Sequence, residues 1–350
     1  MSTSLAIIIS PNYRDYASKY LADCVKSLRQ QSNQDFDLFL VDNETTLESF
    51  SLLKTIAPEA QIISCEKNEG FAGGNNAALK EVLKGEYSLV FLVNMDTVLK
   101  DDCIDQIIKK VDQYPEAGAL QARLMLHPQT ELINSLGNET HFLGFGYSKG
   151  YKDKFSSTHN TIKEIAYPSG AAMLLRVGAL RKVGLFDEEM WMYNEDQDLG
   201  WRLWLVGYTC LIIPSAVVYH KYEFSRSIQK YYWMDRNRII TIFKNYHWLT
   251  LVLILPAFIV MELGLLLFSF QSGWLGEKLK VWKYFFSLSN WKKILVKRHQ
   301  IQRSRTVSEK KILSLLTGRI WYQEIGSWKL RIANIIFGIY WKIIKILVVW

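Results

Sequence analysis

The stretch YSLVFLVNMD, residues 87–96, is an apolar run that ends in two oxygen-bearing side chains, Asn94 and Asp96. A short continuous apolar run is typical of a strand buried on both faces, as in a parallel α/β sheet. Side chains alternate along an extended chain, so Asn94 and Asp96 face the same side. The stretch therefore predicts a central strand with a ligand site at its carboxyl end.

Strand-like and helix-like segments alternate before this run. Apolar runs predict three more strands, at 5–10, 36–41 and 61–65. The repetition predicts an α/β fold with a Rossmann-like parallel sheet, helices on both faces and a ligand crevice at the carboxyl ends of the strands. Asp42 and Asn43 follow the second strand, where the Asp42 carboxylate can accept hydrogen bonds from a nucleobase or ribose. A simple turn is the alternative for this pair, because Asp-Asn favours turns.

The glycine-rich segment NEGFAGGNN (68–76) is predicted to be a loop that opens a helix at about residues 75–83. Backbone amides near a helix start bind phosphate well. The segment matches neither the P-loop nor the GxGxxG dinucleotide pattern. It therefore predicts a loop beside a phosphate, with an ordinary flexible loop as the alternative.

The segment WMYNEDQDLGWR (191–202) crowds Glu195, Asp196 and Asp198 into four positions, and Arg202 follows one helical turn later. Crowded carboxylates repel one another, so they need a metal, a proton or a cationic partner. Asp96 supplies a second acidic site at a strand end. An acid at a strand end and another at a helix start are what metal-assisted transfer from a phosphorylated donor requires.

The oxygen ligands Asp96 and Asn94 suit Mg²⁺ or Mn²⁺ beside a diphosphate. His220 ends the predicted strand VVYH (217–220) and could be a third metal ligand or a phosphate donor. A helix-capping turn is the alternative for Asn94 and Asp96. The alternative for His220 is a structural imidazole beside aromatic residues.

The C-terminal third combines basic charge with long apolar segments. Residues 271–331 contain 14 Lys or Arg and only 3 Glu, whereas the preceding residues are mildly acidic. Residues 248–270 are long enough to span a bilayer, but they contain Pro256 and Glu262. A span would also move the basic region across the membrane, against the positive-inside tendency. We expect a re-entrant or interfacial hairpin here, with one true span as the alternative.

Residues 328–350 predict an interfacial amphipathic helix. Polar residues recur there every three or four positions and form a narrow basic stripe, and isoleucines fill the remaining surface. A helix buried in the protein is the alternative. The twelve Trp favour a membrane surface as the partner of this region. Nucleic-acid binding by the basic segment 291–311 is disfavoured by the adjoining apolar segment.

Four scattered cysteines without a CxxC pair indicate a reducing compartment and no structural zinc. The apolar run at 5–9 is too short for a signal peptide. We therefore expect a cytosolic catalytic domain at 1–225, a connecting helix at 226–247 and a hydrophobic, basic, membrane-associating helical region at 248–350.

Five motifs together resemble glycosyltransferase family 2, whose members have the GT-A fold. They are Asp42-Asn43, NEGFAGGNNAAL (68–79), VFLVNMDTVL (90–99), SGAAMLLRVGALRKVGLFDEEMWMYNEDQDLGWRL (169–203) and VVYH (217–220). The similarity covers about residues 5–245. Within the family, the chain looks most like the rhamnosyltransferase-like branch of bacterial polysaccharide biosynthesis, which builds surface polysaccharides on lipid carriers.

The resemblance implies a role for each matching residue. Asp196 corresponds to the general base, and Glu195 and Asp198 would support it or hold the acceptor. Asp96 stands in the family's DXD metal motif, with Asn94 in place of the first acid, and His220 matches a position that completes the metal site. The donor nucleotide would lie against a larger set of residues: Asn12, Asp42, Asn43, Gly70, Phe71, Gly73, Asn75, Asn94 and Arg202. Arg202 could instead balance the acidic cluster.

The resemblance further implies an inverting glycosyltransferase that uses Mg²⁺ or Mn²⁺ at the cytoplasmic face of the bacterial inner membrane. It would move L-rhamnose from the nucleotide-sugar donor dTDP-rhamnose to a polyprenyl-diphosphate-linked saccharide. A UDP-hexose transferase for galactose or glucose stays open, because the motifs do not separate these donors. A catalytically silent carbohydrate-binding subunit is disfavoured by the intact Glu195-Asp196 pair and by Asp96.

Overall fold

The computed structural model describes residues 4–221, 228–320 and 328–350, which form two compact units. Unit 1 comprises Met1–Asn138, Ser148–Leu203 and Tyr208–Glu223. Unit 2 comprises Glu139–Tyr147, Trp204–Gly207 and Phe224–Trp350. The predicted boundary between residues 225 and 226 lies outside the described residues.

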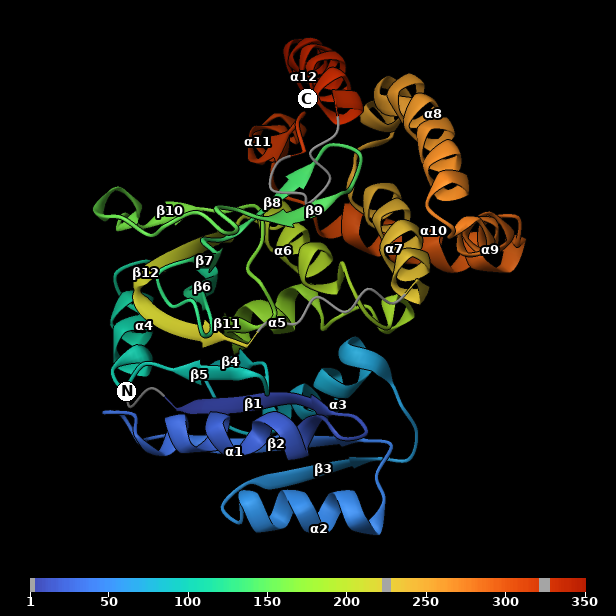
Figure 1. Cartoon of the computed structure of the whole chain (residues 1–350). Coiled ribbons are helices and arrows are strands. Elements are labelled where there is room, and N and C mark those ends of the chain that lie inside the picture. Colours follow the sequence, from blue (N-terminus) through green and yellow to red (C-terminus); the bar gives the residue numbers. More distant parts are fainter. Residues whose placement is uncertain (1–3, 222–227, 321–327) are drawn as a thin grey trace. The chain divides into compact units, whose positions relative to one another are not determined.

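Unit 1 is built on a ten-stranded sheet (Figure 1). Strand β1 (Leu5–Asn12) lies between β2 (Asp37–Asn43) and β4 (Leu89–Val93), and β3 (Gln61–Cys65) forms the edge. These four strands are parallel. They lie where the apolar runs predicted them, and every residue of β4 is buried, as a central strand requires.

The rest of the sheet is mixed, which corrects the expectation of a parallel sheet. Strand β11 (Ala172–Arg176) pairs antiparallel with β4 and with β6 (Ala117–Leu126). Strand β12 (Thr209–His220) is parallel to β6 and begins earlier than the strand predicted at 217–220, with a register irregularity between Ile213 and Val217. Three short strands complete the sheet: β5 (Thr97–Leu99), β7 (Ile133–Ser135) and β10 (Lys163–Glu164).

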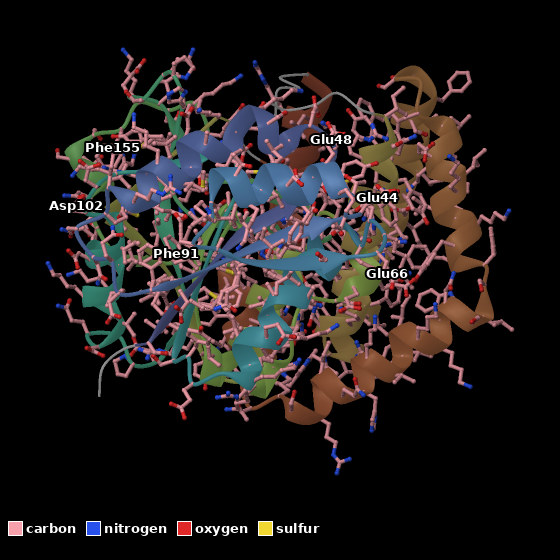
Figure 2. The ribbon with its side chains drawn as sticks, turned by 90° about the horizontal axis from the view of Figure 1, so that it is seen from below. Glu44, Glu48, Glu66, Phe91, Asp102 and Phe155 are labelled. Carbon is pink, nitrogen blue, oxygen red and sulfur yellow. The ribbon has the colours of Figure 1, made fainter. Side chains whose placement is uncertain are left out.

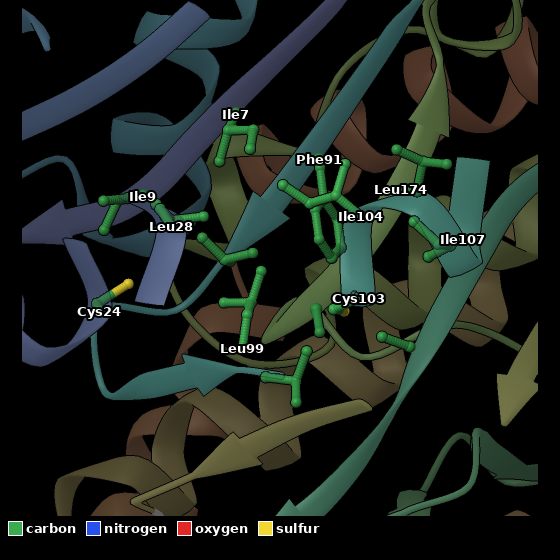
Figure 3. Packing of buried hydrophobic residues seen from close by; sticks show 14 of the residues in the cluster. Ile7, Ile9, Cys24, Leu28, Phe91, Leu99, Cys103, Ile104, Ile107 and Leu174 are labelled. Carbon is green, nitrogen blue, oxygen red and sulfur yellow. The ribbon is translucent and has the colours of Figure 1, made fainter. Parts of the chain in front are cut away.

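Helices cover both faces of this sheet, as predicted. One face is covered by α1 (Tyr16–Arg29), α2 (Leu47–Ile56) and α4 (Cys103–Val111). Figure 3 shows Ile7 of β1 and Phe91 of β4 packed against Leu28 of α1 and Ile104 of α4. Helices α3 (Gly70–Lys84) and α5 (Val177–Val183) pack on the opposite face.

The glycine-rich segment is the first half of α3 rather than a loop. The helix begins at Gly70, earlier than predicted. A Cβ at Gly74 would lie 2.4 Å from Cγ of Pro11, so α3 approaches β1 more closely than a larger residue allows. Glycine has a low helix propensity, which favours a loop from sequence alone, but close packing overrides that preference here.

The carboxyl ends of the parallel strands meet at one edge of the sheet. Glu44 follows β2 and Glu66 follows β3, and Figure 2 shows both on one side of the molecule, away from Asp102. Phe91, in the middle of β4, lies within the sheet. The polar segments 42–44 and 94–96 therefore end at the edge where the sequence predicts the site.

Unit 2 is mainly helical. Its helices are α7 (Gln229–Asn245), α8 (Trp248–Gln271), α9 (Leu275–Phe285), α10 (Leu288–Ser304), α11 (Glu309–Leu315) and α12 (Trp328–Leu347). A small sheet has the order β13 (Leu316–Thr317), β8 (Asn138–His141) and β9 (Gly146–Ser148). The helix predicted at the C-terminus is confirmed by α12, and α7 lies within the predicted connecting helix.

Helix α8 is one continuous helix of 24 residues that includes Pro256. The hairpin predicted within residues 248–270 is therefore wrong, because the chain does not reverse before the end of α8 at Gln271. Among the described residues, α8 alone is long and apolar enough to cross a membrane, judged by length and composition only.

Candidate active site

Asp96 and His220, two of the predicted metal ligands, lie side by side in unit 1. Asp96 follows β4, and His220 ends β12, where it pairs with Thr97 of β5. His220 Nε2 lies 3.1 Å from Asp96 Oδ1, although 124 positions separate the two residues. Both side chains are buried. The sheet topology thus brings a carboxylate and an imidazole together.

Asn134 of β7 orients the imidazole from behind. His220 Nδ1 lies 2.9 Å from Asn134 Oδ1. An amide oxygen accepts but does not donate, so Nδ1 donates and Nε2 is directed at Asp96. Imidazoles that bind metals are commonly oriented by such a hydrogen bond. Asn134 could not be predicted from the sequence, because it lies in a short strand without a recognisable motif.

The groups around Asp96 fit a divalent cation. Burial raises the pKa of Asp96, but hydrogen bonds from His220 and Tyr16 outweigh it and leave that pKa below its ordinary value. Asn94 Oδ1 is buried and has no hydrogen-bond partner among the described residues. The described part of the chain has no cluster of three His, Cys, Asp or Glu side chains suited to a metal. A further ligand would therefore come from Asn94 or from a bound diphosphate.

Asp196 stands at the start of α6 (Glu195–Leu205) and is tied to the segment that enters β11. Its Oδ2 accepts a hydrogen bond from Gly170 N (3.3 Å), and its Oδ1 accepts one from Gln197 N (2.8 Å). The carbonyl of Ala171, the residue after Gly170, accepts from Asn94 N (3.0 Å). Two adjacent residues thus link the predicted base to the end of β4. This use of Gly170 could not be predicted from the sequence, because the contact is made by its backbone N–H.

Glu195 and Asp196 lie in surroundings that favour a neutral carboxyl group. Burial raises the pKa of Asp196 to about 6. Burial, reinforced by the charges of Asp196 and Asp198, raises the pKa of Glu195 well above its ordinary value. A carboxylate that titrates close to neutral pH can accept and release a proton readily.

The turn before α6 has a left-handed backbone at three residues, Trp191 (φ 59°), Tyr193 (φ 67°) and Asn194 (φ 66°). For residues with side chains this costs about 1–3 kcal/mol each, so the surrounding structure must hold the turn. Helix α3 does so, because Ala72 N donates to Trp191 O (3.0 Å). A Cβ at Gly70 would lie 2.4 Å from the same oxygen. Gly70 thus serves the turn that positions Asp196.

Asn12 and Asp42 are adjacent, as their predicted shared role requires. Asn12 Nδ2 donates to Asp42 Oδ1 (3.1 Å), and Ser49 Oγ donates to Asp42 Oδ2 (2.6 Å). The Asp42 residue is fully buried. A nucleobase could reach this carboxylate only if Ser49 or its helix α2 moved.

Asn43 and Gly73 contact neighbouring protein groups and are not free to contact a nucleotide. Asn43 Nδ2 donates to Asn68 Oδ1 (2.9 Å) and Gly70 O (3.2 Å), and its Oδ1 accepts from Glu69 N (2.9 Å). A Cβ at Gly73 would lie 2.7 Å from Cβ of Glu69. These contacts shape the start of α3, which explains both residues without a nucleotide.

Phe71 and Asn75 each keep a group that a ligand could contact. Phe71 is half-buried and meets the ring of Phe186 edge-on, with 6.2 Å between centroids. Asn75 Nδ2 donates to Phe71 O (2.8 Å), whereas Asn75 Oδ1 is buried without a hydrogen-bond partner among the described residues. An acceptor in this state is available to a donor group of a ligand.

Arg202 has a structural role rather than a phosphate-binding one. Its Nε donates to Asp198 Oδ2 (2.9 Å), and its terminal nitrogens donate to the carbonyls of Val183 (2.7 Å) and Leu185 (2.8 Å). Asp198 is fully buried. The pair therefore clamps the segment after α5 to α6, and Asp198 is occupied by its arginine instead of by an acceptor.

The model of the Glycosyl transferase family 2 domain matches residues 7–184, which is half of the chain. The chain belongs to this family. It is 25% identical over 236 residues to the N-acetylglucosaminyl-diphospho-decaprenol L-rhamnosyltransferase of Mycobacterium tuberculosis, covering 62% of this chain and 74% of that protein. It is 26% identical over 116 residues to the glycosyltransferase GlyG of Streptococcus pneumoniae, covering 32% and 36% of the two chains.

Solved structures share the fold. The crystal structure of S. aureus TarS 1–349 in complex with UDP has a TM-score of 0.50 at 16% identity and covers 98% of this chain and 90% of that chain. The crystal structure of GalNAc-T7 with UDP, GalNAc and Mn²⁺ has a TM-score of 0.51 at 12% identity and covers 64% and 44%. The predicted family and the GT-A fold with its C-terminal helical region are confirmed.

Proposed function

We propose that this family 2 glycosyltransferase inverts the anomeric configuration of its donor sugar in one direct displacement, with Asp196 as the base. The observation that carries the proposal is the short backbone link, through Gly170 and Ala171, between Asp196 and the end of β4 that bears Asn94 and Asp96. Asp196 accepts the proton of the acceptor hydroxyl as its oxygen attacks the anomeric carbon. The nucleoside diphosphate leaves from the opposite side, so no enzyme nucleophile is needed.

Asp96 and His220, with Asn94 beside them, would hold Mg²⁺ or Mn²⁺. A cation there would supply charge neutralisation for the leaving diphosphate. Asn134 keeps the imidazole in the orientation that this task needs. Phe71 and Asn75 are the residues that we assign to the nucleotide side. Asn12 and Asp42 would join them once Ser49 leaves Asp42 Oδ2. Asn43, Gly73 and Arg202 are left out, because their contacts are structural.

We infer that the donor is dTDP-rhamnose and the acceptor a polyprenyl-diphosphate-linked saccharide at the cytoplasmic face of the bacterial inner membrane. The mycobacterial relative, named as a rhamnosyltransferase acting on a decaprenol-linked sugar, supports both inferences. A UDP-hexose is the second candidate donor, and the UDP complex of a protein with the same fold favours it. The half-buried, hydrogen-bonded Asp196 disfavours a catalytically silent subunit.

A donor screen tests this function. The purified chain in detergent would receive dTDP-rhamnose, UDP-galactose, UDP-glucose or UDP-N-acetylglucosamine with a lipid-linked saccharide acceptor. Release of nucleoside diphosphate would be followed with Mn²⁺ or Mg²⁺ and then with EDTA. We expect release from dTDP-rhamnose alone, abolished by EDTA. Release from a UDP-sugar alone would show that this UDP-sugar, and not dTDP-rhamnose, is the donor. Absence of binding of every donor would overturn the proposed function.

A further inference from the structure

Unit 2 exposes two apolar helix faces that adjoin each other. Helix α8 exposes large apolar side chains along its whole length, among them Val252, Ile259 and Leu267. The C-terminal α12 does the same at Ile339 and Ile346. The two helices are in contact through Tyr340 Oη, which donates to Leu253 O (2.5 Å). A continuous exposed apolar surface of this kind marks an interaction site.

Four charges, of which Asp235, Arg238 and Lys278 are buried and Glu262 is half-buried, hold another face of α8 against its neighbours. Glu262 of α8 pairs with Lys278 of α9 (2.6 Å) and with Arg238 of α7. Asp235 of α7 pairs with the same two cations, at 2.7 Å and 2.6 Å. Separating a buried pair leaves an uncompensated charge, which is strongly unfavourable. The four charges therefore fix which face of α8 points toward protein and which points outward.

The same contacts disfavour a membrane-crossing orientation of α8. Lys278 reaches Glu262, near the middle of α8, so α9 lies against that part of the helix. Two residues further on, Lys280 of α9 is exposed and pairs with Glu277 (2.7 Å). If α8 crossed a bilayer, Lys280 would be carried into the hydrocarbon layer, where a charge is costly. A helix that lies in the membrane plane leaves this lysine at the level of the headgroups.

We propose that the outward faces of α8 and α12 insert side by side into one leaflet of an anionic bilayer, with α8 in the membrane plane. The partner of this apolar surface is a lipid bilayer, because basic side chains that attract anionic headgroups lie beside the apolar ones. Arg331, Lys342 and Lys345 of α12 are exposed beside its isoleucines. Apolar burial together with attraction to anionic headgroups gives stable interfacial binding. This attachment goes beyond the proposed reaction and does not depend on it.

Vesicle flotation tests the attachment. The purified full chain would be mixed with vesicles of phosphatidylcholine alone or of phosphatidylcholine with phosphatidylglycerol. We expect flotation that is stronger with the anionic lipid. Leu267→Glu on α8 and Ile346→Glu on α12 should each weaken it by roughly tenfold or more, because each removes a large apolar side chain from the lipid. Leu47→Glu is the matched control, since Leu47 of unit 1 is 92% exposed and apolar.

A depth measurement separates the two orientations of α8. Bimane would be attached at Val252→Cys, Ile259→Cys and Leu267→Cys in turn, and the four native cysteines do not compete because they are buried. We expect lipids with a doxyl group near the headgroup to quench all three labels equally. In a membrane-spanning helix, the label at position 259 would be quenched only by doxyl groups near the end of the acyl chain, and the labels at 252 and 267 by doxyl groups near the headgroup. That result would overturn the proposal. Equal flotation of every variant, or a stable dimer in solution that Leu267→Glu dissociates, would overturn it as well.

Discussion

Asp196 is the residue whose ionisation controls the proposed reaction. Burial raises its pKa to about 6, from an ordinary value of 3.8. A raised pKa means that the carboxyl group becomes neutral at a higher pH than an ordinary aspartate, and the neutral form accepts no proton. We therefore expect kcat/KM to fall as the pH drops below about 6. Because Asp196 is coupled to Glu195, the profile reports the pair.

The measurement is a pH profile of nucleoside diphosphate release at saturating metal. An acid limb with an apparent pKa near 3.8 would contradict the raised pKa of Asp196. Stability is monitored over the same range by circular dichroism, so that unfolding at low pH is not mistaken for loss of the base.

Replacement of Arg202 distinguishes a structural role of this residue from a phosphate-binding role. We expect Arg202→Ala to lower the free energy of unfolding by about 3 kcal/mol, because it leaves the buried Asp198 without its cation. Urea unfolding followed by fluorescence gives this value. Arg181→Ala on the neighbouring α5 is the matched control, since Arg181 is exposed and its loss should be nearly neutral. Unchanged stability together with weakened donor binding would restore the phosphate-binding role.

Single residues were predicted from the sequence where their own chemistry marks them. The crowded carboxylates at 195–198 and the polar residues at 94–96 are recognisable in the sequence because apolar residues flank them. The pairing of Arg202 with Asp198 agrees with the expected need of the crowded carboxylates for a cation, whereas the backbone contacts of Asn43 and Arg202 could not be predicted. Any residue can supply a backbone carbonyl, so no pattern of side chains in the sequence predicts such a contact.

At the level of elements, the start of α3 is tightly constrained by glycine. Gly70 has a left-handed backbone (φ 68°), and a Cβ there would meet Trp191 O at 2.4 Å. We expect Gly70→Ala to destabilise the fold by about 1–3 kcal/mol and to displace the turn before Asp196. Gly178→Ala in α5 is the control, because nothing lies within 4 Å of an added Cβ there. It should be neutral or slightly stabilising.

Thermal unfolding and kcat of the two glycine variants check this expectation. Loss of kcat should exceed the change in KM for Gly70→Ala, since the turn positions the base. If both variants behaved alike, the support that α3 gives to the turn would be refuted.

Elements were predictable where local physics dominates. Continuous apolar runs located β1, β2 and β4, because such a run is typical of a strand that is buried on both faces. The direction of β11 was not predictable, since its partners Val93 and Gln121 lie far away in sequence. Pro256 and Glu262 suggested a break in α8. The helix continues through both, and Glu262 finds Lys278 and Arg238 as partners.

At the scale of the whole molecule, the candidate site exists only because the sheet joins distant segments. Asp96 and His220 meet across 124 positions through the pairing of β5 with β12. Asp196 is linked to the end of β4 through the residues that enter β11. The sequence supplied the residue types, and the family resemblance supplied their grouping. Composition and periodicity alone do not predict these distances.

Asp196→Asn decides whether Asp196 acts as the base of a glycosyl transfer. Donor binding and transfer would be measured for Asp196→Asn, with the exposed Asp112→Asn as the control. We expect Asp196→Asn to lower kcat by roughly a thousandfold while the Kd of the donor stays nearly unchanged, because the amide cannot accept the proton. Full turnover by Asp196→Asn would contradict the assignment.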